Sequence, residues 1–309
     1  MEETYTSVAR EVVERLVVKR DKRLGHESIK PLLLVLGGSM RGPYGAGAIH
    51  ALFDFGLGKV FETVVGISTG AAIGAYFLAG SEEQIRLGSS LYFEECTTSL
   101  FFNPWRWRKK VDIDWLIEGI KHGPKRLDVA AIQKNPTQFF VAAITRRGRQ
   151  ELIDAKTASP DILTAIRASM AVPGFYGQWV TVNGQQYCDG GFNDPFPLGN
   201  VIDRFHPTDI LIIPNQSYDV AVGYRPSLSD AIAALMALPQ LGALKAGEIF
   251  RRKMKFRKVM ESLPSIKSAR ISVLWPPALG LHEASRNSTM LRSAYKQSRM
   301  TASKFLHGA

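Results

Sequence analysis

Short, largely apolar runs that end in glycine-rich turns dominate the first third of the chain. Residues 31–36 read PLLLVL and residues 61–65 read FETVV, and each run leads through small residues into a segment of helical character. Apolar runs of this length are typical of buried parallel strands. The pattern predicts two consecutive β-loop-α units, the first with a helix from Pro43 to about residue 55. Both loops are then expected at the carboxyl ends of neighbouring strands, facing one crevice.

The pattern of apolar and polar residues predicts further strands and helices through the rest of the chain. Further strands are predicted at residues 138–144, 150–153, 179–182, 185–187, 210–213 and 271–274, with Asn183-Gly184 as a hairpin turn. Helices are predicted at residues 6–20, 162–171 and 243–263. For the second of these we expect Ser159 at the N-cap, Pro160 at the first helical position and Asp161 in the first turn. The elements indicate an α/β protein with a mostly parallel sheet.

Length and cysteine content narrow the class of protein. A chain of 309 residues is long enough for one large α/β domain or two small ones, and we expect one domain with an elaborated C-terminal part. Only Cys96 and Cys188 are present, which argues against a disulfide framework and favours a reducing, cytoplasmic location. The first residues are charged and lack the apolar core of a secretory signal. Residues 63–81 carry no charge but are diluted by glycine, serine and threonine, so we do not expect a membrane span.

A formal net charge of +11 indicates an anionic partner. No nucleic-acid-binding motif accompanies the charge, so nucleic acid is not expected. Residues 100–115 mix aromatic and cationic side chains, and residues 243–263 form a basic amphipathic segment. Both suit peripheral contact with an anionic membrane. The alternatives are a flap packed on its own protein and a packed helix with a solvated basic face. No feature predicts an oligomeric state.

Residues 66–70, GISTG, fit the G-x-S-x-G pattern, in which a serine lies on a sharp strand-to-helix bend. Gly66 and Gly70 allow the strand and the helix to approach closely. Ser68 would then lie at a helix N-terminus, where free amides favour developing negative charge. Ser68 is therefore the candidate nucleophile.

A serine nucleophile needs a base to accept its proton. In the α/β-hydrolase order this base is a histidine that follows the acid, which leaves His206 or His282. The other possibility is a carboxylate that acts directly on the serine. Asp112 and Asp114 have the spacing of metal ligands, but two alternating acids are more typical of a solvated face, and no metal or cofactor is expected.

Three ordered motifs carry a family resemblance. The glycine-rich loop at residues 37–42 (GGSMRG), the elbow around Ser68 and the Asp189-Gly190-Gly191 turn resemble, in order, three motifs of the patatin-like phospholipase family, over about residues 30–215. The resemblance implies Ser68 as nucleophile and Asp189 as general base. It also implies an oxyanion hole built from backbone amides of the loop: Gly37, Gly38, Ser39, Met40, Arg41 and Gly42. Ser39 departs from the family pattern, which has a third glycine at this position.

The resemblance further implies a three-layer α/β/α sandwich and a serine acyl hydrolase. Its substrates would be fatty-acyl esters of phospholipids or lysophospholipids, cleaved through a Ser-Asp dyad and an acyl-enzyme without metal. The expected organisation is an N-terminal helix (residues 1–29), a catalytic core (residues 30–215) and a helical and strand extension packed on the core (residues 216–309). Two rivals remain: an esterase with a Ser-Asp-His triad, and a non-enzymatic basic membrane-binding protein.

Overall fold

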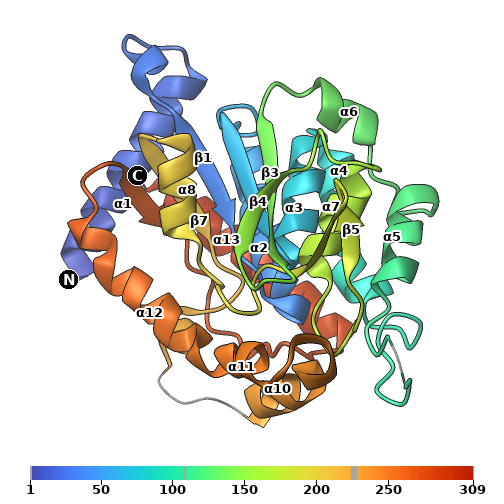
Figure 1. Cartoon of the computed structure of the whole chain (residues 1–309). Coiled ribbons are helices and arrows are strands. Elements are labelled where there is room, and N and C mark those ends of the chain that lie inside the picture. The colour runs from blue at the N-terminus through green and yellow to red at the C-terminus, as the bar shows by residue number, and fades with distance from the viewer. Residues whose placement is uncertain (1, 108, 224–227, 309) are drawn as a thin grey trace.

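One mostly parallel sheet occupies the centre of the molecule (Figure 1). The computed structural model describes residues 2–107, 109–223 and 228–308. The strands within these residues are β1 (Pro31–Val35), β2 (Thr63–Ile67), β3 (Gln138–Thr145), β4 (Gln150–Asp154), β5 (Val180–Val182), β6 (Gln185–Asp189), β7 (Asp209–Ile213) and β8 (Arg270–Val273). Their order is β5-β6-β3-β2-β1-β7-β8, with β4 paired to β3. The pairs between β3 and β8 along this order are parallel, and β4, β5 and β6 pair antiparallel.

Helices cover both faces of the sheet. They are α1 (Glu2–Arg20), α2 (Gly42–Asp54), α3 (Thr69–Leu78), α4 (Glu82–Ser90), α5 (Ile113–His122), α6 (Val129–Lys134), α7 (Ile162–Met170), α8 (Leu198–Phe205), α9 (Tyr218–Val222), α10 (Leu228–Leu241), α11 (Ala243–Ala246), α12 (Arg252–Ser262) and α13 (Ser288–His307). Shorter 3-10 segments include Ser39–Arg41 and Gly247–Arg251, and a π-helical turn spans Leu91–Glu95. In Figure 1, α10, α11 and α12 lie together below the sheet.

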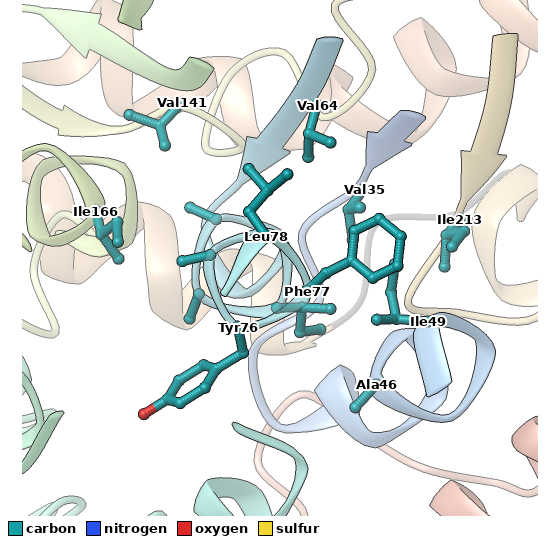
Figure 2. Packing of buried hydrophobic residues seen from close by; sticks show 14 of the residues in the cluster. Val35, Ala46, Ile49, Val64, Tyr76, Phe77, Leu78, Val141, Ile166 and Ile213 are labelled. Carbon is teal, nitrogen blue, oxygen red and sulfur yellow. The ribbon is translucent and has the colours of Figure 1, made fainter. Parts of the chain in front are cut away.

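Two apolar cores lie on opposite faces of the sheet, because successive strand residues point to opposite sides. Leu33 and Val35 of β1 pack into the larger core with α2, α3, α7 and α13. Leu32 and Leu34 pack into the second core with α8 and α12. Figure 2 shows the larger core around Phe77 of α3. This three-layer α/β/α arrangement confirms the fold class predicted from the sequence.

The helix α3 packs unusually close to the strands that precede it. A Cβ at Gly66 would lie 2.5 Å from the Cα of Ala71, and one at Gly70 would overlap the carbonyl oxygen of Val35. Neither position therefore accommodates a side chain. This close packing fixes the start of α3 directly above the ends of β1 and β2, which is where the candidate nucleophile lies.

Two sequence-based expectations for helices are wrong in detail. The N-cap of α7 is Asp161, not Ser159: Asp161 has extended backbone angles, and its carboxylate accepts a hydrogen bond from the Thr164 amide at 2.7 Å. Residues 243–263 form α11, a 3-10 segment and α12 rather than one continuous helix. The charge-free residues 63–81 are β2 and α3 in the core. Among the described residues, no helix is long and apolar enough to cross a membrane.

Candidate active site

Ser68 lies on a strained bend between β2 and α3. Its backbone angles are φ +52° and ψ −124°, a conformation that side-chain-bearing residues rarely adopt. The bend is held by two hydrogen bonds: the Ser68 amide donates to Oγ of Ser169 at 2.9 Å, and the Ala71 amide donates to the Ser68 carbonyl at 2.8 Å. Ser169 in turn donates to the carbonyl of Ala142 on β3 at 2.6 Å. The elbow is thus tied to α7 and to the sheet.

Asp189 ends β6 and is brought to Ser68 by the antiparallel pairing of β6 with β3. The Ser68 side chain interacts with the Asp189 carboxylate and lowers its pKa. The Gly191 amide donates a hydrogen bond to Oδ1 of Asp189 at 2.7 Å. Two residues separated by 121 positions in the chain therefore meet at one end of the sheet.

Burial changes the acidity of Asp189. Only 4% of the residue is exposed, and loss of solvation raises its pKa from the ordinary 3.8 to about 6. The Ser68 side chain, the hydrogen bond from Gly191 and the charge of Arg252 lower the pKa and offset part of this rise. The carboxyl is then mostly ionised at neutral pH but remains a stronger proton acceptor than an exposed aspartate.

The glycine-rich loop (residues 37–42) follows β1 and lies beside Ser68. Three of its amides already have acceptors: Met40 donates to the Glu283 carbonyl at 3.3 Å, Arg41 to the Gly38 carbonyl at 3.0 Å, and Gly42 to the Ser39 carbonyl. Within the described part of the chain, the amides of Gly37, Gly38 and Ser39 donate to no protein acceptor. The donors available to a ligand are therefore on the N-terminal half of the loop.

Ser39 adopts a left-handed backbone conformation, with φ +51°. This explains why a glycine is the natural residue at the position, since a Cβ in this region is sterically penalised. The Ser39 carbonyl accepts a hydrogen bond from Oγ1 of Thr69, the first residue of α3, at 3.0 Å. Ser39 therefore adopts the backbone conformation that a glycine would have at this position, although it carries a side chain.

Asn215, which follows β7, supports the loop from behind. It is fully buried, its Oδ1 accepts from the Gly45 amide at 2.7 Å, and its Nδ2 donates to the Leu36 carbonyl at 2.6 Å. A Cβ at Gly38 would collide with the Cβ of Asn215 and lie 2.9 Å from its carbonyl oxygen. Gly38 is thus required by close approach to Asn215.

A cavity of about 610 Å³ opens onto these groups. Its polar lining includes Ser68, Asp189 and residues 37–41, together with the charged side chains of Arg252, Lys253 and Glu283. Most of the remaining wall is apolar, with side chains that include Phe101, Phe102, Leu116, Met170, Phe175 and Phe256. A long apolar cavity wall beside a few convergent polar groups is the arrangement expected for an apolar ligand with one reactive polar bond.

The other sequence candidates lie elsewhere or have different partners. His206 is exposed at the end of α8, and His282 is an exposed residue at the cavity wall. Asp112 caps α5 by accepting from the Trp115 amide at 3.1 Å, and Asp114 binds Arg167, Tyr176 and Lys109. No cluster of three potential metal ligands occurs among the described residues.

Ser169 and Asn215 are the site residues that sequence reasoning missed. Ser169 lies within the segment AIRASMAVPGF that carries part of the family resemblance, but no spacing rule marks it. Asn215 lies two residues after the buried strand β7, where a ligand-facing or loop-supporting residue is expected in an open α/β sheet. That position was the one available signal.

The two segments considered for membrane contact, residues 243–263 and residues 100–115, differ in how far their side chains are engaged with the rest of the protein. Five basic residues of the 243–263 segment are in ion pairs: Arg251 and Lys255 with Glu248, Arg252 with Asp230 and Glu283, Lys253 with Asp230, and Arg257 with Glu261. By contrast, Trp105 is 93% exposed and Trp107 is 91% exposed, although Phe101 and Phe102 nearby line the cavity.

Comparisons with known proteins agree with the fold. The model of the patatin-like phospholipase family matches residues 33–202. The uncharacterized protein YjjU of Escherichia coli (strain K12) is 25% identical over 283 residues, which cover 89% of this chain and 76% of that protein. The crystal structure of VipD from Legionella pneumophila superposes with a TM-score of 0.50 at 14% identity, over 91% of this chain and 67% of that one.

Proposed function

Because the chain belongs to the patatin-like phospholipase family, we propose that it is a serine acyl hydrolase that cleaves fatty-acyl esters of phospholipids or lysophospholipids. Family membership supports a lipid hydrolase in general. One observation carries the finer proposal: Ser68 and the buried Asp189 carboxylate meet in the wall of one largely apolar cavity, where the Ser68 side chain lowers the Asp189 pKa.

In the proposed reaction Asp189 accepts the Ser68 proton while Oγ attacks the ester carbonyl. The tetrahedral intermediate collapses, the leaving alcohol takes the proton from Asp189, and an acyl-enzyme remains. A water molecule then attacks the acyl group and gives its proton to Asp189. Collapse of the second intermediate returns that proton to Ser68 and releases the fatty acid.

We assign the oxyanion hole to the amides of Gly38 and Ser39, with Gly37 as a third available donor. The assignment is narrower than the six-residue loop, because the amides of Met40, Arg41 and Gly42 already have acceptors. Each well-placed amide of this kind contributes about 10² to 10³ in kcat. The pKa of about 6 for Asp189 supports its role as the base, because the group is ionised near neutral pH and still accepts a proton readily.

Substitution of the two residues tests the proposal. Ser68→Ala should abolish both fluorophosphonate labelling and ester hydrolysis, and Asp189→Asn should lower kcat by about 10² to 10⁴. Ser90→Ala is the control, since the Ser90 hydroxyl binds the Leu87 carbonyl away from the cavity. Absence of labelling in the wild-type protein would favour the non-enzymatic reading.

The same experiment separates the dyad from a Ser-Asp-His triad. His282→Gln should leave kcat unchanged if Asp189 is the base, and should lower it as strongly as Asp189→Asn if His282 is the base.

The Asp189→Asn variant should remain folded. Because the native pKa of Asp189 is raised above its ordinary value, ionisation of Asp189 lowers native stability as the pH rises from about 4 to about 6, and asparagine avoids this loss.

We also propose peripheral contact with an anionic membrane through residues 100–115, of which residue 108 lies outside the described residues. Exposed Trp105 and Trp107 support this assignment, because tryptophan is favoured at the boundary between lipid and water. The nearby Phe101 and Phe102 line the cavity, so a membrane bound at this segment would lie next to the cavity wall. The ion pairs of Arg251, Arg252 and Lys255 favour a packed basic helix over a membrane contact for residues 243–263.

A further inference from the structure

Glu283, near the C-terminal end of the chain, contacts two adjacent residues of the glycine-rich loop. Its backbone carbonyl accepts a hydrogen bond from the Met40 amide at 3.3 Å. Its side-chain Oε1 lies 2.9 Å from Nη2 of Arg41. One residue that lies 242 positions from Arg41 in the chain therefore holds both the backbone and the side chain of the loop.

Arg41 connects Glu283 to the candidate oxyanion hole. Its backbone amide and its Nε both donate to the Gly38 carbonyl oxygen, at 3.0 and 3.3 Å. A trans peptide is planar, so the direction of its carbonyl also determines the opposite direction of its N–H. The N–H on the other side of this peptide belongs to Ser39, one of the amides with no protein acceptor. The backbone amide and the side chain of Arg41 together therefore fix the direction in which the Ser39 N–H points.

The Arg41 side chain needs a carboxylate to remain where it is. Only 7% of Arg41 is exposed, and a buried guanidinium without a counter-charge is strongly disfavoured. Burial would raise the pKa of Glu283, but the charges of Arg252 and Arg41 lower it below its ordinary value, so Glu283 is ionised at neutral pH. The loop conformation thus depends on the Glu283 charge.

Glu283 is itself fixed by α12. Nη2 of Arg252 lies 2.8 Å from Oε1 of Glu283 and 2.9 Å from Oδ1 of Asp230 on α10. Asp230 is almost completely buried. Two elements that follow the region of family resemblance therefore reach the glycine-rich loop through a single carboxylate.

We propose that Glu283 is a positioning residue of the glycine-rich loop, which orients the Ser39 N–H toward the oxyanion through Arg41 and the Gly38 carbonyl. The inference rests on the proposed acyl hydrolase function. It makes the segment around Glu283 part of the catalytic apparatus, although Glu283 touches no reacting atom. Loss of its charge should weaken transition-state stabilisation and leave substrate binding unchanged, because the oxyanion exists only after attack on the carbonyl.

The test uses hydrolysis of p-nitrophenyl butyrate, a soluble ester that requires no membrane contact. Glu283→Gln keeps the backbone acceptor for Met40 and removes only the charge. We expect kcat to fall by about 10-fold or more with KM unchanged, since small misplacements of catalytic groups have effects of this order. Glu283→Asp, which keeps the charge, should retain a higher kcat than Glu283→Gln and keeps the test valid if the glutamine variant folds poorly.

Glu94→Gln is the matched control. Glu94 also lies between two cations, Lys125 and Arg292, but its contacts do not reach the glycine-rich loop. It should lose a similar amount of thermal stability and keep the wild-type kcat. Wild-type kcat in both Glu283 variants, or an equal loss in Glu94→Gln, would overturn the inference. A wild-type protein that neither hydrolyses the ester nor reacts with a fluorophosphonate would instead overturn the proposed function.

Discussion

Asp189 experiences two opposing influences at the residue scale. Burial disfavours its negative charge, whereas the Ser68 side chain and a hydrogen bond from the Gly191 amide favour it. The balance leaves a carboxyl whose pKa of about 6 lies above its ordinary value and still below neutral pH. An exposed aspartate would be a weaker base, and one buried without these donors would have a higher pKa.

This balance predicts the pH dependence of hydrolysis. The value of kcat/KM for a soluble ester should be constant above about pH 7 and should fall about tenfold per pH unit well below pH 6, because protonated Asp189 cannot accept the Ser68 proton. The measurement is a pH profile of kcat/KM on p-nitrophenyl butyrate, with folding followed by circular dichroism at each pH. A profile that is flat down to about pH 4.5 in a folded protein would contradict this role of Asp189.

The residues that sequence patterns identify differ from those that only contacts identify. Ser68 and Asp189 each stand in a short glycine-framed motif, so their types and spacing were visible without coordinates. Ser169, Asn215 and Glu283 act through hydrogen bonds to residues between 101 and 242 positions away. Such contacts are created by the tertiary fold, and no local pattern encodes them.

Close approach between elements explains the glycines at the element scale. The start of α3 touches the end of β1, and Gly70 stands at the contact with the carbonyl oxygen of Val35. The glycine therefore allows the bend at Ser68 to sit directly beside the glycine-rich loop. Its role is steric and not conformational, because Gly70 is within a regular helix.

Gly70→Ala tests this contact. We expect it to lower the free energy of unfolding by about 1–3 kcal/mol or more, because the added methyl overlaps backbone that cannot rotate away. The matched control is Gly119→Ala in α5, where an added Cβ meets no atom within 4 Å. That substitution should stabilise by up to about 1 kcal/mol through helix propensity. Urea denaturation measures both, and equal effects would show that Gly70 is not sterically required.

Local patterns predicted every strand of the described residues but only some of the helices, since α4, α5, α6, α8, α9, α10 and α13 have no predicted counterpart. The eight strands within the described residues all correspond to predicted strands, because buried strands read as short apolar runs between turn residues. The predicted N-cap of α7 is wrong, because both Ser159 and Asp161 are good capping residues and only the backbone angles distinguish them. The 243–263 segment was predicted as one helix, because its composition does not mark the transition to a 3-10 segment.

The order of the strands belongs to the scale of the whole molecule. Parallel neighbours with intervening helices indicated the α/β class, but the chain reaches β7 and β8 only after the hairpin of β5 and β6 has been placed at the opposite edge. The apolar run at residues 271–274 does not by itself place β8 at the edge of the sheet, although β8 is only partly buried and β7 is buried throughout. The family resemblance, and not the pattern, supplied the layer arrangement.

The proposed membrane contact also belongs to the whole molecule. Trp105→Ala combined with Trp107→Ala should weaken binding to anionic phosphatidylglycerol vesicles and slow hydrolysis of vesicle lipids, because two exposed rings no longer insert at the interface. Hydrolysis of a soluble ester should be unchanged. Vesicle sedimentation and both assays measure the effect. Unchanged sedimentation would show that Trp105 and Trp107 do not contribute to membrane binding.

The position of β7 limits how far the chain can be shortened without loss of the proposed active site. β7 lies directly beside β1, and it is followed by Asn215, Arg252 and Glu283, all downstream of residue 202, where the family match ends. A fragment cut to the matched region would leave one side of β1 without a hydrogen-bonding neighbour and the glycine-rich loop without its supports. Any chimera or minimal version that is to inherit the chemistry must therefore carry the chain onward through Glu283.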